Sequence, residues 1–102
     1  MLWDPSKDKP IVDKTGECYL KAIEIIEQKG WCQGKLMNNQ GEVCMAGAIQ
    51  MATYQSVALQ GKALKLMHKT LGTLISRWND APERTKDEVI AKLREIAYAK
   101  RS

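Results

Sequence analysis

Apolar residues recur at helical spacing in four separate stretches of this chain, and this periodicity restricts the fold more than any other feature. The clearest stretch predicts a helix over about 62–78, and weaker stretches predict helices over about 16–29, over 45–55 and after Thr85. Because each helix has one apolar face, the four faces must close on a common core. The apolar positions of the 62–78 helix are Ala63, Leu64, Met67, Leu71, Leu74, Ile75 and Trp78.

Capping and helix-breaking residues set the predicted ends of these helices. Thr15 can accept a hydrogen bond from a free amide in the first turn of the first helix. Gly30 can adopt the left-handed conformation that ends many helices. Pro82 cannot continue a helix. Thr85 and Glu88 form a capping box, so the last helix is predicted to begin after Thr85.

A short β-hairpin is predicted between the first two helices. Its strand candidates are residues 35–37 and 42–44, and the turn between them is rich in Asn and Gly, which tolerate positive φ angles. Gly47 lies within the second predicted helix, between two alanines. A glycine inside a helix costs roughly 1 kcal/mol against alanine, so Gly47 predicts a close approach of another backbone.

The predicted architecture is therefore mainly α, a compact four-helix domain with one short β-hairpin between helices 1 and 2. We expect residues 1–12 to form an extended N-terminal arm, because Pro5 and Pro10 prevent helix there. Residues 13–102 are expected to form a single helical domain. Trp3 either ties the arm to this domain or contacts a partner.

The composition indicates an ordinary globular protein in a reducing compartment. A hydrophobic fraction of 44% and a charged fraction of 27% argue against global disorder. No apolar run approaches the roughly 18 residues that cross a bilayer, and the first residues lack the apolar stretch of a secretory signal. We therefore expect a cytoplasmic protein with no membrane partner. The odd count of cysteines (Cys18, Cys32 and Cys44) favours reduced thiols over a disulfide framework.

The charge is uneven along the chain, which has a net charge of +4. Residues 1–51 hold six basic and seven acidic side chains, whereas residues 52–102 hold ten and five. On the 62–78 helix, basic side chains share one face and could follow phosphates, so a nucleic-acid-associated protein is one alternative. An ordinary solvated face is the competing interpretation. The residues concerned are Lys62, Lys65, Lys69 and Arg77.

A thiol- or metal-dependent activity is another alternative. Cys32 follows a helix end and Cys44 precedes a predicted helix start, where a lowered pKa can make a thiol nucleophilic. His68 could act as the base, and with Cys18 these residues supply the number of ligands that tetrahedral zinc requires. Buried, inert cysteines are the competing interpretation, and none of the four is paired at zinc-motif spacing. We therefore expect no metal and no other cofactor.

Two loop clusters form the favoured binding surface. Each places a tryptophan at the end of a predicted helix, followed by polar groups, and such mixtures of flat apolar walls and directional hydrogen bonds are typical of ligand pockets. The competing interpretation is that the tryptophans close the ends of the core while the polar groups satisfy turn backbone. The favoured site residues are Trp31, Gln33, Gly34, Trp78, Asn79 and Asp80.

Three motifs resemble a family of small uncharacterised proteins found in bacteriophages and actinobacterial genomes. They are GWCQG at 30–34, CMAGAI at 44–49 and WNDAPERT at 78–85, and the likeness covers about residues 16–99. The resemblance implies no activity, but it implies a phage or mobile-element accessory protein. We expect a small non-enzymatic protein that binds or neutralises a host protein or sequesters a small ligand. Its oligomeric state is open.

Overall fold

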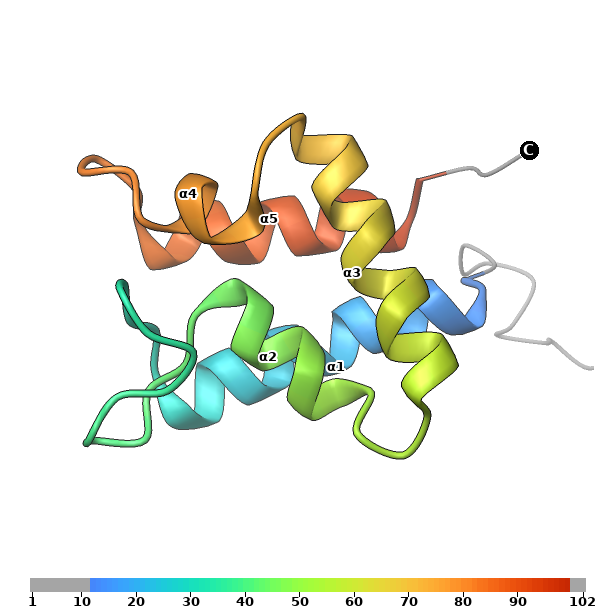
Figure 1. Ribbon diagram of the computed structural model, residues 1–102, viewed down its shortest axis with the longest axis horizontal. Coiled ribbons are helices and arrows are strands. Elements are labelled where there is room, and N and C mark those ends of the chain that lie inside the picture. Colours follow the sequence, from blue (N-terminus) through green and yellow to red (C-terminus); the bar gives the residue numbers. More distant parts are fainter. Residues whose placement is uncertain (1–11, 100–102) are drawn as a thin grey trace, which may run out of the picture.

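The computed structural model describes residues 12–99, which fold mainly into helices (Figure 1). This confirms the predicted helical class. The predicted arm and Trp3 lie outside the described residues, apart from Val12. In the described part the helices are α1 (Lys14–Lys29), α2 (Met45–Ala52), α3 (Val57–Leu71), α4 (Ile75–Asn79) and α5 (Lys86–Ala97).

Helix α1 makes the most extensive helix contacts of the fold, with α2 and with α5, and it also contacts α3. Figure 1 shows α5 running alongside α1. Helix α3 crosses near the start of α1 and the end of α5. Tyr19 of α1 is fully buried, and its hydroxyl donates to the carbonyl of Ala63 in α3 at 2.6 Å. The short helix α4 packs on α2 and α3. No helix between residues 12 and 99 is long and apolar enough to span a bilayer.

Helix α1 begins two residues earlier than predicted. Asp13, not Thr15, caps it: the Asp13 carboxylate accepts a hydrogen bond from the Gly16 amide at 2.7 Å. Thr15 is buried instead. A Cβ at Gly16 would lie 2.6 Å from the carbonyl oxygen of Ala97, so the first turn of α1 lies against the last turn of α5. Gly30 ends α1 at a φ of 92°, as its sequence position predicted.

The single helix predicted over 62–78 is wrong, since this segment forms two helices. Helix α3 begins at Val57, capped by the Ser56 hydroxyl, and ends at Leu71. Gly72 follows at a φ of 72°, in the left-handed conformation that commonly terminates a helix. The second helix is α4. Similarly, α2 ends at Ala52, three residues before the predicted end at 55.

The predicted β-hairpin is not found, and residues 12–99 contain isolated bridges in place of strands. The chain reverses at Gly41, as predicted, and Met37 forms one antiparallel bridge with Val43. The backbone amide and carbonyl of Val43 bond to Gly30 and Cys32 instead, which places Val43 between two segments. Because each neighbour pairs with Val43 at one residue only, no ladder extends in either direction.

Two local predictions are confirmed. Thr85 and Glu88 make both hydrogen bonds of the capping box at the start of α5. A Cβ at Gly47 would collide with the carbonyl oxygen of Leu36, so the loop that carries Leu36 crosses α2 at the glycine. Gly47 thereby sets the position of Leu36 on the surface.

Candidate functional site

The structure joins five of the six favoured residues through hydrogen bonds, although the two loop clusters lie about half the chain apart, and Trp78 directly precedes two of the five. The segment after α1 supplies Trp31, Gln33 and Gly34, and the end of α4 supplies the other three. Hydrogen bonds between the clusters link residues 46 to 48 positions apart. We call this set the loop clamp, and its members are Trp31, Gln33, Gly34, Trp78, Asn79 and Asp80.

Asn79 is the centre of the loop clamp and is fully buried. Its side-chain oxygen accepts from the indole nitrogen of Trp31 at 2.7 Å and from the Met45 amide at 3.1 Å. Its side-chain nitrogen donates to the carbonyl of Cys32 at 3.1 Å and to the Asp80 carboxylate at 3.0 Å. An asparagine amide can accept two hydrogen bonds and donate two, so Asn79 is fully satisfied. It also caps α2, because Met45 is the first residue of that helix.

The exposed members of the loop clamp also form hydrogen bonds between the two loops. The side-chain nitrogen of Gln33 donates to the carbonyls of Asn79 and Ala81 at 3.0 and 2.9 Å. The Gly34 amide donates to the Asp80 carboxylate at 2.9 Å. Gly34 has a φ of 83°, and this conformation directs its amide at Asp80. The clamp therefore ties the loop after α1 to the end of α4.

Arg84 covers the tryptophan of the second cluster and was not among the predicted site residues. Its guanidinium lies 3.7 Å from the centroid of the Trp78 ring, and its Nε donates to the Trp78 carbonyl at 2.8 Å. It also pairs with Glu88 at 3.0 Å. The spacing of Arg84 and Glu88, four residues apart at a helix start, was the available sequence signal.

These contacts agree with turn-satisfying roles for Asn79 and Asp80, which the sequence left as the competing interpretation. Trp31 and Trp78 are half-buried, and both contribute to the rim of the core. Gln33, Gly34 and Asp80 stay exposed. The loop clamp therefore has a buried part that fixes two loops and an accessible part that faces solvent.

All three thiols are buried, and burial raises the pKa of each. For Cys44, hydrogen bonds from the Gly47 and Ala46 amides act in the opposite direction, but burial outweighs them. The Cys44 sulfur accepts from the Gly47 amide at 3.3 Å and so caps α2. Cys32 donates to two loop carbonyls, of Lys35 and Glu42. Protonated thiols in such sites are poor nucleophiles.

The ligand set considered for a metal is not gathered in space. Within residues 12–99, no three His, Cys, Asp or Glu side chains are placed to hold a metal ion. His68 lies on α3 and is exposed, whereas Cys44 lies at the buried start of α2. The two side chains therefore lie on different helices and differ in their exposure to solvent.

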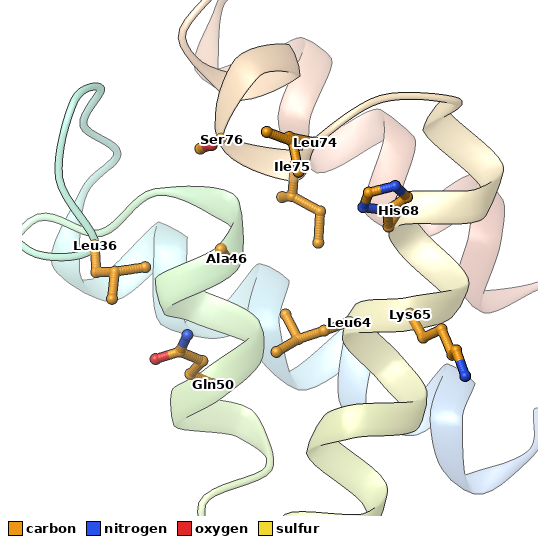
Figure 2. A pocket seen from close by; sticks show the side chains of 9 residues that line it. All are labelled: Leu36, Ala46, Gln50, Leu64, Lys65, His68, Leu74, Ile75 and Ser76. Carbon is orange, nitrogen blue, oxygen red and sulfur yellow. The ribbon is translucent and has the colours of Figure 1, made fainter.

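A hollow of about 640 Å³ lies between α2, α3 and the start of α4 (Figure 2). Leu36, Leu64 and Ile75 surround it from three elements, as Figure 2 shows, and His68 and Lys65 stand at its α3 side. The wall is predominantly apolar and open to solvent. We call it the apolar groove, lined by Leu36, Ala46, Gln50, Leu64, Lys65, His68, Leu74, Ile75 and Ser76.

Two smaller hollows adjoin the apolar groove. One, of about 340 Å³, shares Leu36 and Gln50 with it. The other, of about 210 Å³, shares Leu36 and Ser76 with the groove and Gly34 and Asp80 with the loop clamp. The clamp and the groove are therefore neighbouring parts of one surface.

The sequence predicted no site at the apolar groove, although two of its residues, Lys65 and His68, were candidates for the alternative sites. Leu74 was placed on the buried face of a helix that does not continue so far, and Leu36 was placed in a strand. In the structure these side chains are 53% and 50% exposed. The signals that point to them are Gly72, which breaks the helix, and two adjacent apolar residues in a polar loop, Leu36 and Met37.

The four residues of the predicted basic face lie on two helices instead of one. Lys62, Lys65 and Lys69 are exposed on α3, and Arg77 is exposed on α4. No acidic residue occurs between positions 43 and 79, so α2, α3 and α4 carry no carboxylate side chain. The acidic residues of the described chain belong to α1, α5 and the loops beside them.

A model of one protein family matches residues 12–99, and its description is a family of unknown function, DUF6197. The match spans every element of the fold and includes all the residues of the loop clamp. No curated protein and no solved structure matches the chain.

Proposed function

Because this chain belongs to DUF6197, a family of unknown function, we propose a role from its own geometry: it is a small non-enzymatic binding protein. Its ligand is a host protein or a small molecule held in the apolar groove beside the loop clamp. In this proposal the clamp residues fix the loop that carries Leu36, and Gly34 and Asp80 line the extension of the groove.

The observation that carries the proposal is a cluster of exposed apolar side chains. Residues 12–99 expose six large apolar side chains, of which four line the apolar groove or the 340 Å³ hollow beside it. Concentrated apolar surface next to polar groups is typical of interaction sites, whereas isolated exposed leucines are ordinary. The four are Leu36, Met37, Tyr54 and Leu74.

Two features support a non-enzymatic role over the thiol alternative. Burial raises the pKa of Cys32 and of Cys44, which keeps both thiols protonated. Asn79, the most buried polar side chain of the clamp, directs all its hydrogen-bonding groups at protein partners, so none is left for a substrate.

We also propose that the protein is an accessory protein of a phage or mobile element. This part rests on the resemblance of the three motifs alone. Genome neighbourhood tests it: we expect phage structural or integration genes beside the coding sequence, and housekeeping neighbours would contradict it.

The binding proposal is tested by affinity capture from host lysate with a matched pair of variants, Leu74→Asp and Val57→Asp. Both positions lie at the start of a helix, where an aspartate is tolerated, and both side chains are exposed. Only Leu74 lines the apolar groove. Mass spectrometry then identifies captured proteins and small molecules.

We expect wild type and Val57→Asp to retain the same molecule and Leu74→Asp to lose it. A molecule retained equally by all three proteins would place the binding surface elsewhere. A wild-type protein that retains nothing above an empty resin would contradict the binding function itself. Circular dichroism of each variant confirms that the comparison is made between folded proteins.

Nucleic-acid association is a second candidate, favoured by the absence of carboxylates between residues 43 and 79. Phosphate contacts by Lys62, Lys65 and Lys69 would release counterions, so the affinity would fall steeply with salt. Titration with a fluorescent single-stranded or duplex DNA at low and high salt checks this. No detectable binding at low salt would remove the candidate.

A further inference from the structure

We propose that the apolar groove takes an amphipathic helix from a partner protein, with an apolar stripe facing the groove and acidic residues along its flanks. This inference rests on the proposed binding function and specifies the occupant of the same surface. Three observations support it: the shape of the groove, the charge around it and the secondary structure of its walls.

The shape favours a long ligand. The main hollow and its 340 Å³ neighbour share Leu36 and Gln50, so the apolar surface continues from the start of α4 to Tyr54 beyond the end of α2. Both hollows are open to solvent. A small ligand usually needs a pocket that encloses most of its surface, whereas an amphipathic helix buries only one face.

The charge favours an acidic partner. Lys65 and His68 line the groove, and no residue that lines either hollow is acidic. In Figure 2 the Lys65 side chain extends along the outer edge, with its ammonium directed away from the apolar centre. That position suits contact with a carboxylate on the flank of a bound helix, since flank charges stay partly solvated. A basic flank would be repelled by Lys65 and by the other lysines of α3.

The walls favour a helix over an extended peptide. Peptides that bind in extended form usually add to the edge of a sheet, where unpaired backbone groups supply hydrogen bonds. The described residues contain no strand, and the groove is bounded by three helices and the loop at Leu36, so it offers no sheet edge to an extended peptide. A ligand whose own backbone is internally paired matches such walls.

The experiment uses two displayed libraries of helical peptides with the full protein chain as bait. Both vary apolar residues at positions i, i+3, i+4 and i+7. One carries glutamate and the other lysine at all flanking positions. We expect the glutamate library to be enriched and the lysine library not to be. Equal enrichment of the two, enrichment of the lysine library or enrichment of neither would overturn the proposal.

Variants then locate the enriched peptide on the protein. We expect Leu74→Asp to weaken its binding roughly tenfold or more, while Val57→Asp binds as wild type does. We expect Lys65→Glu to weaken it, whereas Lys62→Glu, which alters the same helix outside the groove, has little effect. Chemical-shift changes at the amides of Ala46 and Leu64 should accompany binding. Peptide binding that ignores Leu74→Asp would overturn the proposal.

Failure of the helix proposal can be distinguished from failure of the proposed binding function. If neither library is enriched but a lysate molecule still depends on Leu74, the binding function stands and the helical occupant is wrong. Decanoate, which has an acidic head and an apolar tail without a helix, is the remaining probe. If decanoate binds with the same dependence on Leu74 and the peptides do not, the occupant is a small anionic amphiphile and the helix proposal fails.

Discussion

Asn79 shows how one side chain holds two distant segments of this chain together. It is fully buried, and each of its polar atoms has two partners. A buried amide is costly without partners and specific with them, because a shifted loop leaves donors and acceptors unpaired. Asn79 therefore selects one relative position for the loop after α1 and the end of α4.

Replacing Asn79 with alanine should lower the free energy of unfolding by roughly 2–4 kcal/mol, because the Met45 amide and the Cys32 carbonyl lose a buried partner. Urea unfolding followed by tryptophan fluorescence measures this. Asn39→Ala, in the exposed turn nearby, is the control and should change stability by less than about 0.5 kcal/mol. Similar decreases in the free energy of unfolding for the two variants would show that the hydrogen bonds of Asn79 do not stabilise the fold.

Gly47 and Gly61 form a matched pair for a second test. Both lie inside helices without positive φ, but a Cβ at Gly47 meets the Leu36 carbonyl, whereas a Cβ at Gly61 meets nothing within 4 Å. Gly47→Ala should cost roughly 1–3 kcal/mol and displace Leu36. Gly61→Ala should stabilise by roughly 0.5–1 kcal/mol. Thermal unfolding of both variants checks the signs, and a stable Gly47→Ala would contradict the close crossing.

For single residues, the sequence predicted the local backbone conformation well but did not predict which distant residues they contact. Gly47 was predicted to allow a close contact, since glycine inside a helix needs a reason, but nothing local indicated that Leu36 would supply it. Asn79 was expected near a turn, yet its partner Trp31 is 48 residues away. A hydrogen bond between such distant residues depends on the whole fold, which a local pattern does not contain.

Helix α5 is the element whose start was predicted most directly. The Thr85 hydroxyl accepts from the Glu88 amide at 3.2 Å, and the Glu88 carboxylate accepts from the Thr85 amide at 3.1 Å. These bonds depend only on residues three positions apart, so the sequence contains all of the information. The start of α1 was misplaced because Asp13 and Thr15 are both good capping residues, and in the structure Asp13 caps the helix while Thr15 is buried.

Thr85→Ala should lower the free energy of unfolding by about 1 kcal/mol, because a free amide of the first turn loses its acceptor. Thr85→Ser keeps the hydroxyl and should stay close to wild type. Chemical denaturation of both variants at neutral pH provides the comparison. Equal stability of the alanine and serine variants would show that water replaces the cap at no cost.

The break between α3 and α4 marks the limit of periodicity as a predictor. Leu74 and Ile75 continue the helical phase of Met67 and Leu71, so the apolar pattern alone favours one long helix. Gly72 in the left-handed conformation ends α3, and α4 then places Ile75 back in the core while Leu74 stays exposed. Three of the nine groove residues, Leu74, Ile75 and Ser76, follow this break.

The apolar groove exists only at the scale of the whole molecule. Its lining comes from α2, α3, the start of α4 and the loop at Leu36, which no local pattern relates to one another. The helical class and most helix positions could be predicted, because they follow from periodicity and caps. The loop clamp residues were identified as a group, but their mutual bonding and the groove beside them required the tertiary arrangement.

The buried thiols should make the whole fold less stable at alkaline pH. Burial raises the pKa of Cys18, Cys32 and Cys44 above that of the unfolded chain, so folding favours the protonated thiols. This stabilisation is complete below the unfolded-state pKa, about 8.5, and is lost as the pH rises toward the folded-state values. We expect the free energy of unfolding to fall between about pH 8 and pH 10.

Urea unfolding at several pH values measures this, with the variant Cys18→Ala, Cys32→Ala, Cys44→Ala as reference. The two proteins differ only in the thiols, so the difference in slope isolates their contribution. We expect the steeper loss in wild type. Parallel curves would show that the thiols keep an ordinary pKa in the folded protein.

The contact between the first turn of α1 and the last turn of α5 has a consequence for chain connectivity. Because Gly16 lies against Ala97, the two ends of the described chain, at residues 12 and 99, lie close together. A short connection could therefore join them. A circular permutant that links residue 99 to residue 12 and opens between Tyr54 and Gln55, both exposed, should keep the same core. In that permutant α3 would be the first helix and α2 the last, and the Trp31–Asn79 bond would form across the new junction.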